Sequence, residues 1–205
     1  MLTVVTVKLE SPRVILWDIM DTLVRDPFFT HMPGFFGHTF EALVKRLQPG
    51  TWVEFELGKL NELEFYARFF RDGSPIDGPG LKRCMAQAYD WVEGMPALLA
   101  DLQARAVNMH ALSNYPEWYQ LVEERLALSQ FVQLTFISCR TGFRKPAPEA
   151  FLHACAHLDV PPEQCLLIDD RAQNCESARK VGLQSLHFDG SIPALRQGLV
   201  AHGLL

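Results

Sequence analysis

The sequence predicts an α/β fold in which a doubly wound parallel sheet carries an inserted group of helices. Beyond residue 94, short apolar runs alternate with helical segments, which is typical of parallel strands joined by helices. Between residues 24 and 94, helical periodicity continues with no strand pattern. We therefore expect one domain built from residues 1–23 and 95–205, and a second, helical domain of residues 24–94.

The first strand of the sheet is predicted near the start of the chain. Four apolar residues, Val14–Trp17, are followed directly by Asp18. This pattern predicts a buried parallel strand with an acidic residue at its carboxyl end. Ligands of open α/β sheets bind at that end of the strands. A short edge strand is also expected earlier, at Val4–Val7.

The helical domain is predicted to begin after an aromatic segment punctuated by proline and glycine. Apolar residues at helical spacing indicate one stripe, Pro49-Gly50 ends it, and Asn61 is in a position to cap a later helix. The predicted helices are one through Phe36, Phe40, Leu43, Val44 and Leu47, a second over Trp52–Leu57, a third capped by Asn61, and a fourth over Pro79–Trp91.

The rest of the chain is predicted to alternate between helix and strand. Gly182 stands where a helix C-terminal cap is expected. The predicted helices are Met95–Ala104, Trp118–Leu126, one through Phe151 and His157, and Asn174–Val181. The predicted strands are Val107–Leu112, Leu134–Ser138, Cys165–Ile168 and Gln184–Phe188.

Composition excludes several classes of function. A net charge of −5 disfavours a nucleic-acid groove. The sequence contains no run of about 18 apolar residues, so we expect no membrane span. No signal segment is evident at the N-terminus. The five cysteines include no C-x-x-C spacing, which favours free thiols in a reducing compartment. We expect a soluble intracellular protein without a nucleic-acid or membrane partner.

Chemically useful side chains follow four of the predicted strands. They are the carboxylate of Asp18, the hydroxyl and amide of Ser113-Asn114, the ammonium of Lys145, and the carboxylate pair Asp169-Asp170. A carboxylate can attack phosphorus, carboxylates and a main-chain oxygen can hold Mg²⁺, and lysine and hydroxyl donors can neutralise phosphoryl oxygens. This set is what phosphoryl transfer through an aspartyl-phosphate requires.

The same four stretches resemble the motifs of the haloacid dehalogenase (HAD) superfamily. They stand in the superfamily's order as D-I-M-D-T, H-A-L-S-N, G-F-R-K-P-A-P and I-D-D-R-A-Q-N. The resemblance implies a Rossmann-like core with a helical cap inserted at residues 24–94. It also implies an Mg²⁺-dependent phosphatase that acts on a small phosphate ester.

The resemblance further implies roles for individual residues. Asp18 would be the nucleophile, while Ser113, Asn114 and Lys145 would hold the phosphoryl group. The metal would lie on Asp18, the main-chain carbonyl of Met20 and Asp170, supported by Asp169. Asn174, one helical turn further on, would either contact a water on the metal or stabilise the start of its helix.

A closer similarity is to the plastid flavin mononucleotide (FMN) hydrolases of plants and algae. It rests on D-I-M-D-T-L-V-R-D-P-F, S-N-Y-P-E-W-Y and R-K-P-A-P-E. It implies FMN as the substrate and the chloroplast stroma as the location. The residues expected to bind the substrate are Asn114, Arg144 and the aromatic side chains Phe28, Phe29, Trp52 and Tyr115.

Three alternatives remain on the sequence. The substrate could be another small metabolite, such as a sugar phosphate or pyridoxal phosphate. A dehalogenase also uses an aspartate nucleophile, but it needs no metal, and the Asp169-Asp170 pair argues against it. A binding protein on an inactive core is the third, because Met20 stands where HAD phosphatases usually carry a second aspartate as general acid and base.

The missing second aspartate leaves the proton donor open. Asp21 is one residue beyond the usual position, so a tight loop could turn its carboxylate inward, or the residue could instead cap the turn. The other candidates for this role are a metal-bound water and direct stabilisation by Lys145.

Overall fold

The computed structural model describes residues 11–205, so the edge strand expected at Val4–Val7 lies outside the described residues. Its centre is a five-stranded parallel sheet in the order β3-β2-β1-β4-β5. The strands are β1 (Val14–Trp17), β2 (Asn108–Ser113), β3 (Gln133–Ile137), β4 (Cys165–Asp169) and β5 (Gln184–His187). The predicted α/β class and parallel sheet are confirmed.

The register of the sheet brings three of the four motifs together. Strand β1 is central, with Trp17 opposite Ala111 of β2 on one side and Ile168 of β4 on the other. The amide of Asp18 donates to the carbonyl of Ile168 at 2.9 Å. The residues that follow these three strands therefore emerge at one edge of the sheet.

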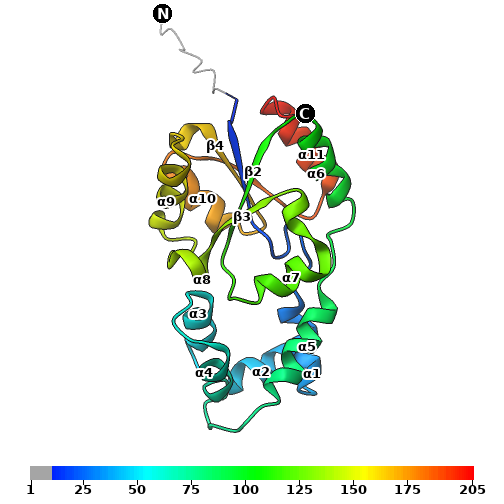
Figure 1. Ribbon diagram of the computed structural model, residues 1–205, viewed down its shortest axis with the longest axis vertical. Coiled ribbons are helices and arrows are strands. Elements are labelled where there is room, and N and C mark those ends of the chain that lie inside the picture. The colour runs from blue at the N-terminus through cyan, green and yellow to red at the C-terminus, as the bar shows by residue number, and fades with distance from the viewer. Residues whose placement is uncertain (1–10) are drawn as a thin grey trace, which may run out of the picture.

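Helices cover both faces of the sheet, as Figure 1 shows. Ile15 and Trp17 point to the face covered by α6 (Met95–Ala104), α7 (Tyr119–Leu126) and α11 (Ile192–Ala201). The intervening Val14 and Leu16 point to the face covered by α9 (Pro148–Leu158) and α10 (Ala172–Lys180). All four of these β1 side chains are at most 1% exposed, which explains why the strand is apolar throughout.

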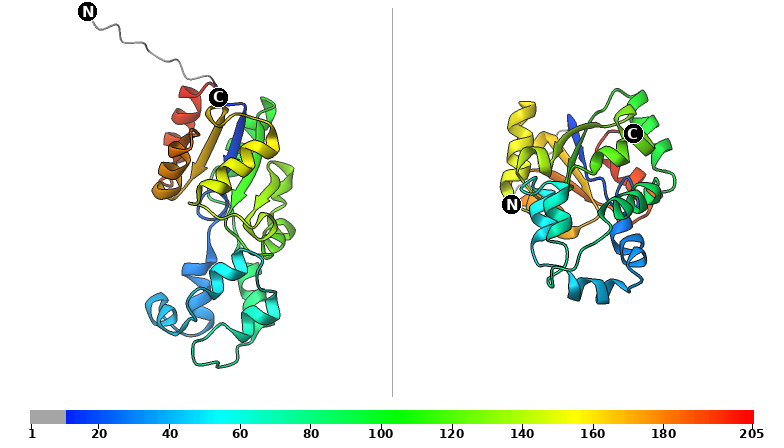
Figure 2. Two further views of the ribbon diagram at one scale, coloured as in Figure 1. Left: turned by 90° about the vertical axis from the view of Figure 1, so that its left-hand side faces the viewer. Right: turned by 60° about the horizontal axis from the view of Figure 1, so that its bottom comes forward.

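A second group of helices lies beyond the carboxyl ends of the strands, stacked along the long axis of the molecule in Figure 2. The group comprises the 3₁₀ turn η1 (Pro27–Phe29) and the helices α1 (His31–Phe35), α2 (Phe40–Arg46), α3 (Thr51–Glu56), α4 (Glu62–Ala67) and α5 (Gly78–Ala88). We call this group the cap and the sheet with its covering helices the core. The division of the chain at residues 23 and 95 stays a prediction.

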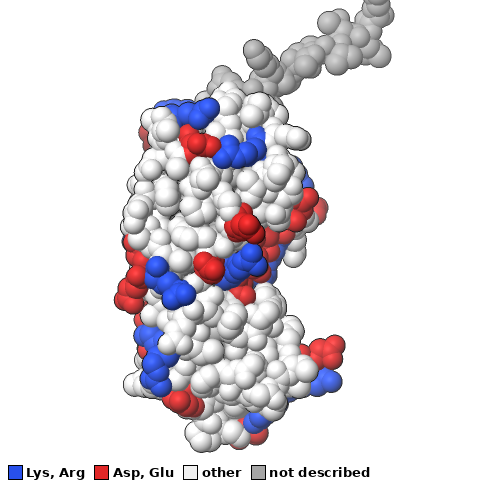
Figure 3. Space-filling view, turned by 90° about the vertical axis from the view of Figure 1, so that its right-hand side faces the viewer, with Lys and Arg blue, Asp and Glu red and all other residues white. Residues whose placement is uncertain are grey.

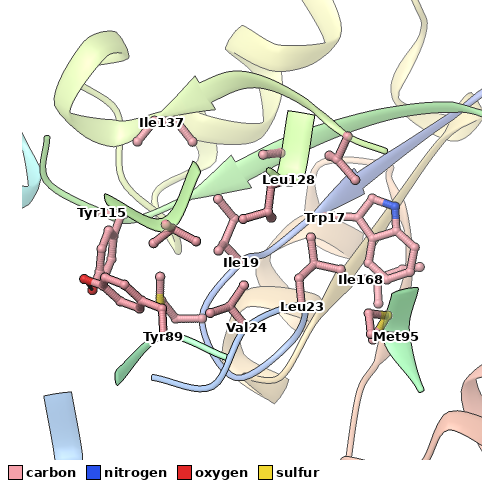
Figure 4. Packing of buried hydrophobic residues seen from close by; sticks show 14 of the residues in the cluster. Trp17, Ile19, Leu23, Val24, Tyr89, Met95, Tyr115, Leu128, Ile137 and Ile168 are labelled. Atoms are coloured by element: carbon pink, nitrogen blue, oxygen red, sulfur yellow. Dashed lines mark hydrogen bonds between the residues drawn. The ribbon is translucent and has the colours of Figure 1, made fainter. Parts of the chain in front are cut away.

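The two segments that join the cap to the core run side by side. Val24 forms an antiparallel bridge with Trp91, the amide of Arg25 donates to the carbonyl of Asp90, and the amide of Val92 donates to the carbonyl of Leu23, each hydrogen bond at 2.9 Å. Figure 4 shows buried hydrophobic side chains packed next to these segments. Among them, the hydroxyl oxygens of Tyr89 and Tyr115 lie 2.8 Å apart. The two segments that connect the cap to the core are thus hydrogen-bonded to each other.

Most of the predicted helices and strands form within two residues of their expected bounds. The helix expected through Phe36 to Leu47 is an exception, because its counterpart α2 begins only at Phe40 and a separate short helix, α1, ends before Phe36. Phe36 lies in the turn between them, where Gly37 takes a φ of +64° and Thr39 caps α2 by accepting from the Ala42 amide. The prediction was wrong at the start of the helix because Phe36 has the apolar spacing of α2, and spacing alone does not show where a helix begins.

Several smaller features complete the fold. Helix α5 ends at Ala88, earlier than the predicted Trp91. The elements that were not predicted are α1, α8 (Ser138–Thr141), α11 and the 3₁₀ turns η1, η2 (Leu128–Gln130) and η3 (Pro162–Gln164). Asn61 forms the expected cap of α4, as a capping box with Glu64. All five cysteines are free. Within residues 11–205, no helix has the length and apolar character needed to cross a bilayer.

Candidate active site

A cavity of about 220 Å³ lies between the core and the cap, at the carboxyl ends of β1, β2 and β4. Figure 3 shows acidic and basic side chains gathered at this level of the molecule. The core contributes Asp18, Met20, Asn114, Tyr115, Arg144, Lys145, Asp170, Arg171 and Asn174. The cap and its connection contribute Asp26, Phe28, Phe29, Trp52 and Glu56. Most of the predicted site residues therefore share one cavity.

The floor of the cavity is a buried ion cluster. Lys145 is 1% exposed, and its Nζ donates to Oδ1 of Asp18 at 2.7 Å and to Oδ2 of Asp169 at 2.6 Å. Burial opposes the charge of Lys145, but Asp169 and Asp18 outweigh burial and raise its pKa. Burial also raises the pKa of Asp18, an effect that Lys145 opposes. The lysine stays charged and holds the two carboxylates in place.

Asp169 is the most heavily bonded member of this cluster. Its Oδ1 accepts from the Arg171 amide and from Asn174 Nδ2, both at 2.9 Å. Its Oδ2 accepts from Asn174 Nδ2 at 3.0 Å besides Lys145. Asp169 does not line the cavity, and it is fully buried. Its contacts fix Lys145 and the start of α10, where Asn174 lies.

Asp170 differs from its neighbour, because it lines the cavity and is only partly buried. Burial, followed by the charge of Asp169, raises its pKa. Ligand oxygens of Asp18, Asp169 and Asp170 lie within 4.8 Å of one another. An all-oxygen set of this kind fits a hard divalent cation such as Mg²⁺, and the main-chain carbonyl of Met20, at the same cavity, would add a further oxygen.

Thr22 links the first and fourth motifs through hydrogen bonds that were not predicted. Its hydroxyl donates to Oδ2 of Asp18 at 3.3 Å and accepts from the Asp170 amide at 3.1 Å. The side chain is fully buried. The threonine thus orients the Asp18 carboxylate relative to the acidic pair.

The second motif supplies two side chains with different surroundings. Ser113 is 2% exposed, does not line the cavity, and its hydroxyl has no hydrogen-bond partner within the described residues. Asn114 does line the cavity, but its amide is engaged with the Lys145 main chain, donating to the carbonyl and accepting from the amide, both at 2.8 Å. In this arrangement Asn114 positions the lysine.

The roof of the cavity is aromatic. Phe28 lies 4.8 Å from Trp52 and 5.3 Å from Phe29, measured between ring centroids. Tyr115 approaches Trp52 from the core side at 6.2 Å. All four side chains line the cavity, as the sequence predicts, although Phe29 is 42% exposed. These rings form a wall suited to a flat aromatic group.

An ion pair between cap and core closes one side of the cavity. Oε2 of Glu56 accepts from Arg144 Nε at 2.7 Å, and Oε1 accepts from Trp52 Nε1 at 2.7 Å. Burial raises the pKa of Glu56, and Arg144 opposes that rise. Arg144 and Trp52 are among the predicted site residues, whereas Glu56 is not. The spacing of Trp52 and Glu56, four residues apart on one helix, is the signal that could have found it.

The side chain of Asp21 does not reach the cavity. Its backbone adopts a φ of +56°, its side chain is exposed, and its Oδ1 accepts from the Asp26 amide at 2.9 Å. The cavity-lining carboxyl group near it belongs to Asp26. Asp26 and Arg171 are not among the predicted site residues. An Asp-Pro step before an aromatic pair indicates the N-terminal cap of a short helix. This signal does not predict that the Asp26 side chain lines a cavity.

Comparison with known proteins places this geometry in a family. A family model described as haloacid dehalogenase-like hydrolase matches residues 80–182. The chain is 43% identical over 178 residues to the chloroplast flavin mononucleotide hydrolase 1 of Arabidopsis thaliana, covering 87% of this chain and 73% of that protein. It is 28% identical over 151 residues to a sesquiterpene phosphatase of Aspergillus oryzae, covering 69% and 74% of the two chains.

Solved structures agree on the fold. A HAD-family enzyme from Bacteroides thetaiotaomicron, in complex with magnesium and inorganic phosphate, matches with a TM-score of 0.69 and 18% identity, covering 86% of this chain and 93% of that one. An L-2-haloacid dehalogenase from Xanthobacter autotrophicus matches with a TM-score of 0.64 and 15% identity, covering 93% and 83%. This chain belongs to the haloacid dehalogenase-like hydrolases.

Proposed function

We propose that this chain is an Mg²⁺-dependent phosphatase that hydrolyses FMN to riboflavin and inorganic phosphate. The observation that carries the proposal is the division of one cavity into a carboxylate–lysine floor and an aromatic roof. The floor offers the groups that phosphoryl transfer needs, and the roof offers faces for a flat ring system. The identity to an FMN hydrolase over most of the chain supports the choice of the flavin.

The nucleophile in this proposal is Asp18. One of its carboxylate oxygens forms a bond to phosphorus while the bond from phosphorus to the ester oxygen breaks, which leaves an aspartyl-phosphate. A water molecule then attacks phosphorus, the bond to Asp18 breaks, and the carboxylate and inorganic phosphate are released. Thr22 and Lys145, which already bond to Asp18, keep it oriented for both attacks.

Lys145 would also stabilise the charge on the phosphoryl group. An ammonium group has three donors, and two of them reach Asp18 and Asp169, so one remains for a phosphoryl oxygen. The unpartnered hydroxyl of Ser113 supports a second donor at the same strand ends, because a buried hydroxyl without a partner is unusual. Asn114 would act by holding the Lys145 main chain.

Asp18, Asp170 and the carbonyl of Met20 would hold Mg²⁺, with Asp169 in a supporting place. When bound, the ion would neutralise charge on the phosphoryl oxygens. The supporting role of Asp169 follows from its hydrogen bonds, which occupy both of its oxygens, whereas Asp170 faces the cavity. We further propose a plastid location, on the strength of the chloroplast relative.

The test is phosphate release from a panel of esters, with Mg²⁺ and with a chelator. We expect FMN to have the highest kcat/KM, pyridoxal phosphate, sugar phosphates and glycerol phosphate to be poorer, and the chelator to abolish turnover. Riboflavin should inhibit, since it keeps the ring and lacks the phosphate. Equal kcat/KM for FMN and glycerol phosphate would contradict the flavin assignment, and no release from any ester would contradict the phosphatase.

A further inference from the structure

The proposed reaction needs a proton donor that the first motif does not provide. The leaving group of FMN is a primary alkoxide, which departs poorly unless it is protonated. Met20 lines the cavity where HAD phosphatases usually carry an acid, and its side chain has no proton to give. Asp21, the neighbouring candidate, is exposed and bonded to the Asp26 main chain outside the cavity.

Four carboxyl groups line the cavity in the described part of the chain, and three of them have other tasks. Asp18 and Asp170 belong to the oxygen cluster suited to a cation. Glu56 has both oxygens engaged, one with Arg144 and one with Trp52. The fourth is Asp26.

Asp26 is fixed at the junction of core and cap. Its Oδ1 accepts from the Phe28 amide at 2.9 Å as the N-cap of η1, while Pro27 follows it directly. Its Oδ2 takes part in no hydrogen bond within the described residues. The amide of Arg25, the preceding residue, is bonded to Asp90 on the returning linker. One carboxyl oxygen is therefore anchored and the other is free to face the cavity.

The surroundings of Asp26 favour its protonated form near neutral pH. Burial raises the pKa of Asp26 to about 7, assisted by Asp21 from the turn after β1 and by Glu56 from α3. The Phe28 amide and Arg171, at the start of α10, act in the opposite direction. The charge of Asp26 also acts on Tyr89 and Tyr115, but burial raises the pKa of both hydroxyls well above neutrality, so they stay uncharged.

We propose that Asp26 is the general acid and base of this enzyme, taking the role that Met20 cannot fill. The assignment rests on the proposed phosphatase function. As Asp18 attacks and the ester bond breaks, Asp26 gives its proton to the departing ester oxygen, which leaves as riboflavin. Asp26, now a carboxylate, then takes a proton from the water that attacks the aspartyl-phosphate. The cycle ends with Asp18 as a carboxylate, Asp26 protonated again and inorganic phosphate released.

The experiment compares the first turnover of two substrates in the Mg²⁺-loaded enzyme. FMN has an alkoxide leaving group that needs the acid, whereas para-nitrophenyl phosphate has a leaving group that does not. In Asp26→Asn, we expect release of riboflavin in the first turnover to slow by about 10²–10⁴-fold, with nitrophenolate release in the first turnover close to wild type. Later turnovers should slow for both substrates, because the water then lacks its base.

The variant is chosen to preserve the fold, since asparagine caps a helix as well as aspartate does. Asp77→Asn is the matched control: Asp77 caps α5 by accepting from the Gly80 amide, and it does not line the cavity. That variant should keep both first-turnover rates. A pH profile adds a second readout, because kcat/KM for FMN should fall as pH rises through about 7 in the wild type and lose that limb in Asp26→Asn.

Two outcomes would overturn the assignment. In an active wild-type background, an Asp26→Asn variant that slows both first turnovers equally, or neither, would show that Asp26 is not the acid and leave the phosphatase standing. A wild-type enzyme that releases phosphate from neither ester would instead overturn the proposed function, and the assignment with it.

Discussion

The floor and the roof of the cavity are held by different kinds of contact. On the floor, Asp18, Lys145 and Asp169 form buried ion pairs of 2.6–2.7 Å at the ends of adjacent strands. On the roof, aromatic rings meet in tilted or edge-on contacts, and the Glu56–Arg144 ion pair joins α3 to the core. The floor is therefore fixed by the sheet, whereas the roof depends on how the cap sits.

This difference assigns separate tasks to the two ends. A charge cluster with several mutual bonds suits chemistry that is the same for every phosphate ester. A wall of rings distinguishes substrates by their shape and by the area that they bury. Changes on the floor should thus affect all substrates alike, and changes on the roof should affect flavin substrates most.

The largest effect should come from Asp18→Asn on the floor. An amide is too poor a nucleophile to form the acyl phosphate, so turnover of FMN and of para-nitrophenyl phosphate should both fall on the order of 10³-fold or more. The variant should retain the wild-type circular dichroism spectrum. A variant that keeps a tenth of wild-type turnover on either ester would contradict the covalent mechanism.

The next effect concerns stability, with Lys145→Met compared with Lys180→Met. Removing Lys145 leaves the buried Asp18 and Asp169 unpaired, which should lower the free energy of unfolding by about 3–5 kcal/mol. Lys180 pairs with Glu176 on the surface, where the side chains are 69% and 60% exposed and water screens the pair, so its loss should change the free energy of unfolding far less. Urea unfolding of both variants makes the measurement, and equal losses would contradict the distinction.

On the roof, Trp52→Ala removes one face of the aromatic wall. The value of kcat/KM for FMN should therefore fall by the equivalent of about 1–3 kcal/mol in transition-state stabilisation. Glycerol phosphate, which has no ring, should change little. Trp52→Phe loses the hydrogen bond to Glu56 but keeps an aromatic face. It should therefore retain most of the FMN activity that Trp52→Ala loses. If both substrates lost activity equally, Trp52 would not select the ring.

The smallest effect is the pH dependence of stability in Asp26→Asn. Since burial raises the pKa of Asp26 from 3.8 to about 7, the folded state holds a proton that the unfolded state releases between those values. The wild type should therefore lose stability as pH rises through this window. The variant lacks that loss, so its free energy of unfolding relative to wild type should be about 1 kcal/mol more favourable at pH 8 than at pH 6. No difference between the two pH values would contradict the raised pKa.

Much of the fold was available from local patterns. The run Val14–Trp17 is apolar on both faces because β1 is covered on both faces, and this property is visible in four consecutive residues. The order of the motifs along the chain predicted which side chains would meet, because parallel strands deliver them to the same edge. The late start of α2 escaped prediction because Phe36 keeps the apolar spacing of that helix although the turn at Gly37 separates it from Phe40.

The sequence by itself determined the α/β class, the central strand and the motif residues, since periodicity and strand ends are local properties of the chain. Only the tertiary structure decided how the cavity is completed. Glu56 meets Arg144 across 88 positions of sequence, and Asn114 holds Lys145 across 31. Asp21 and Asp26 are near neighbours in sequence, yet the turn at Asp21 leaves its carboxylate outside while Asp26 lines the cavity. Such placements depend on contacts between segments that are distant in sequence and on the exact backbone of a turn, and no local pattern encodes them.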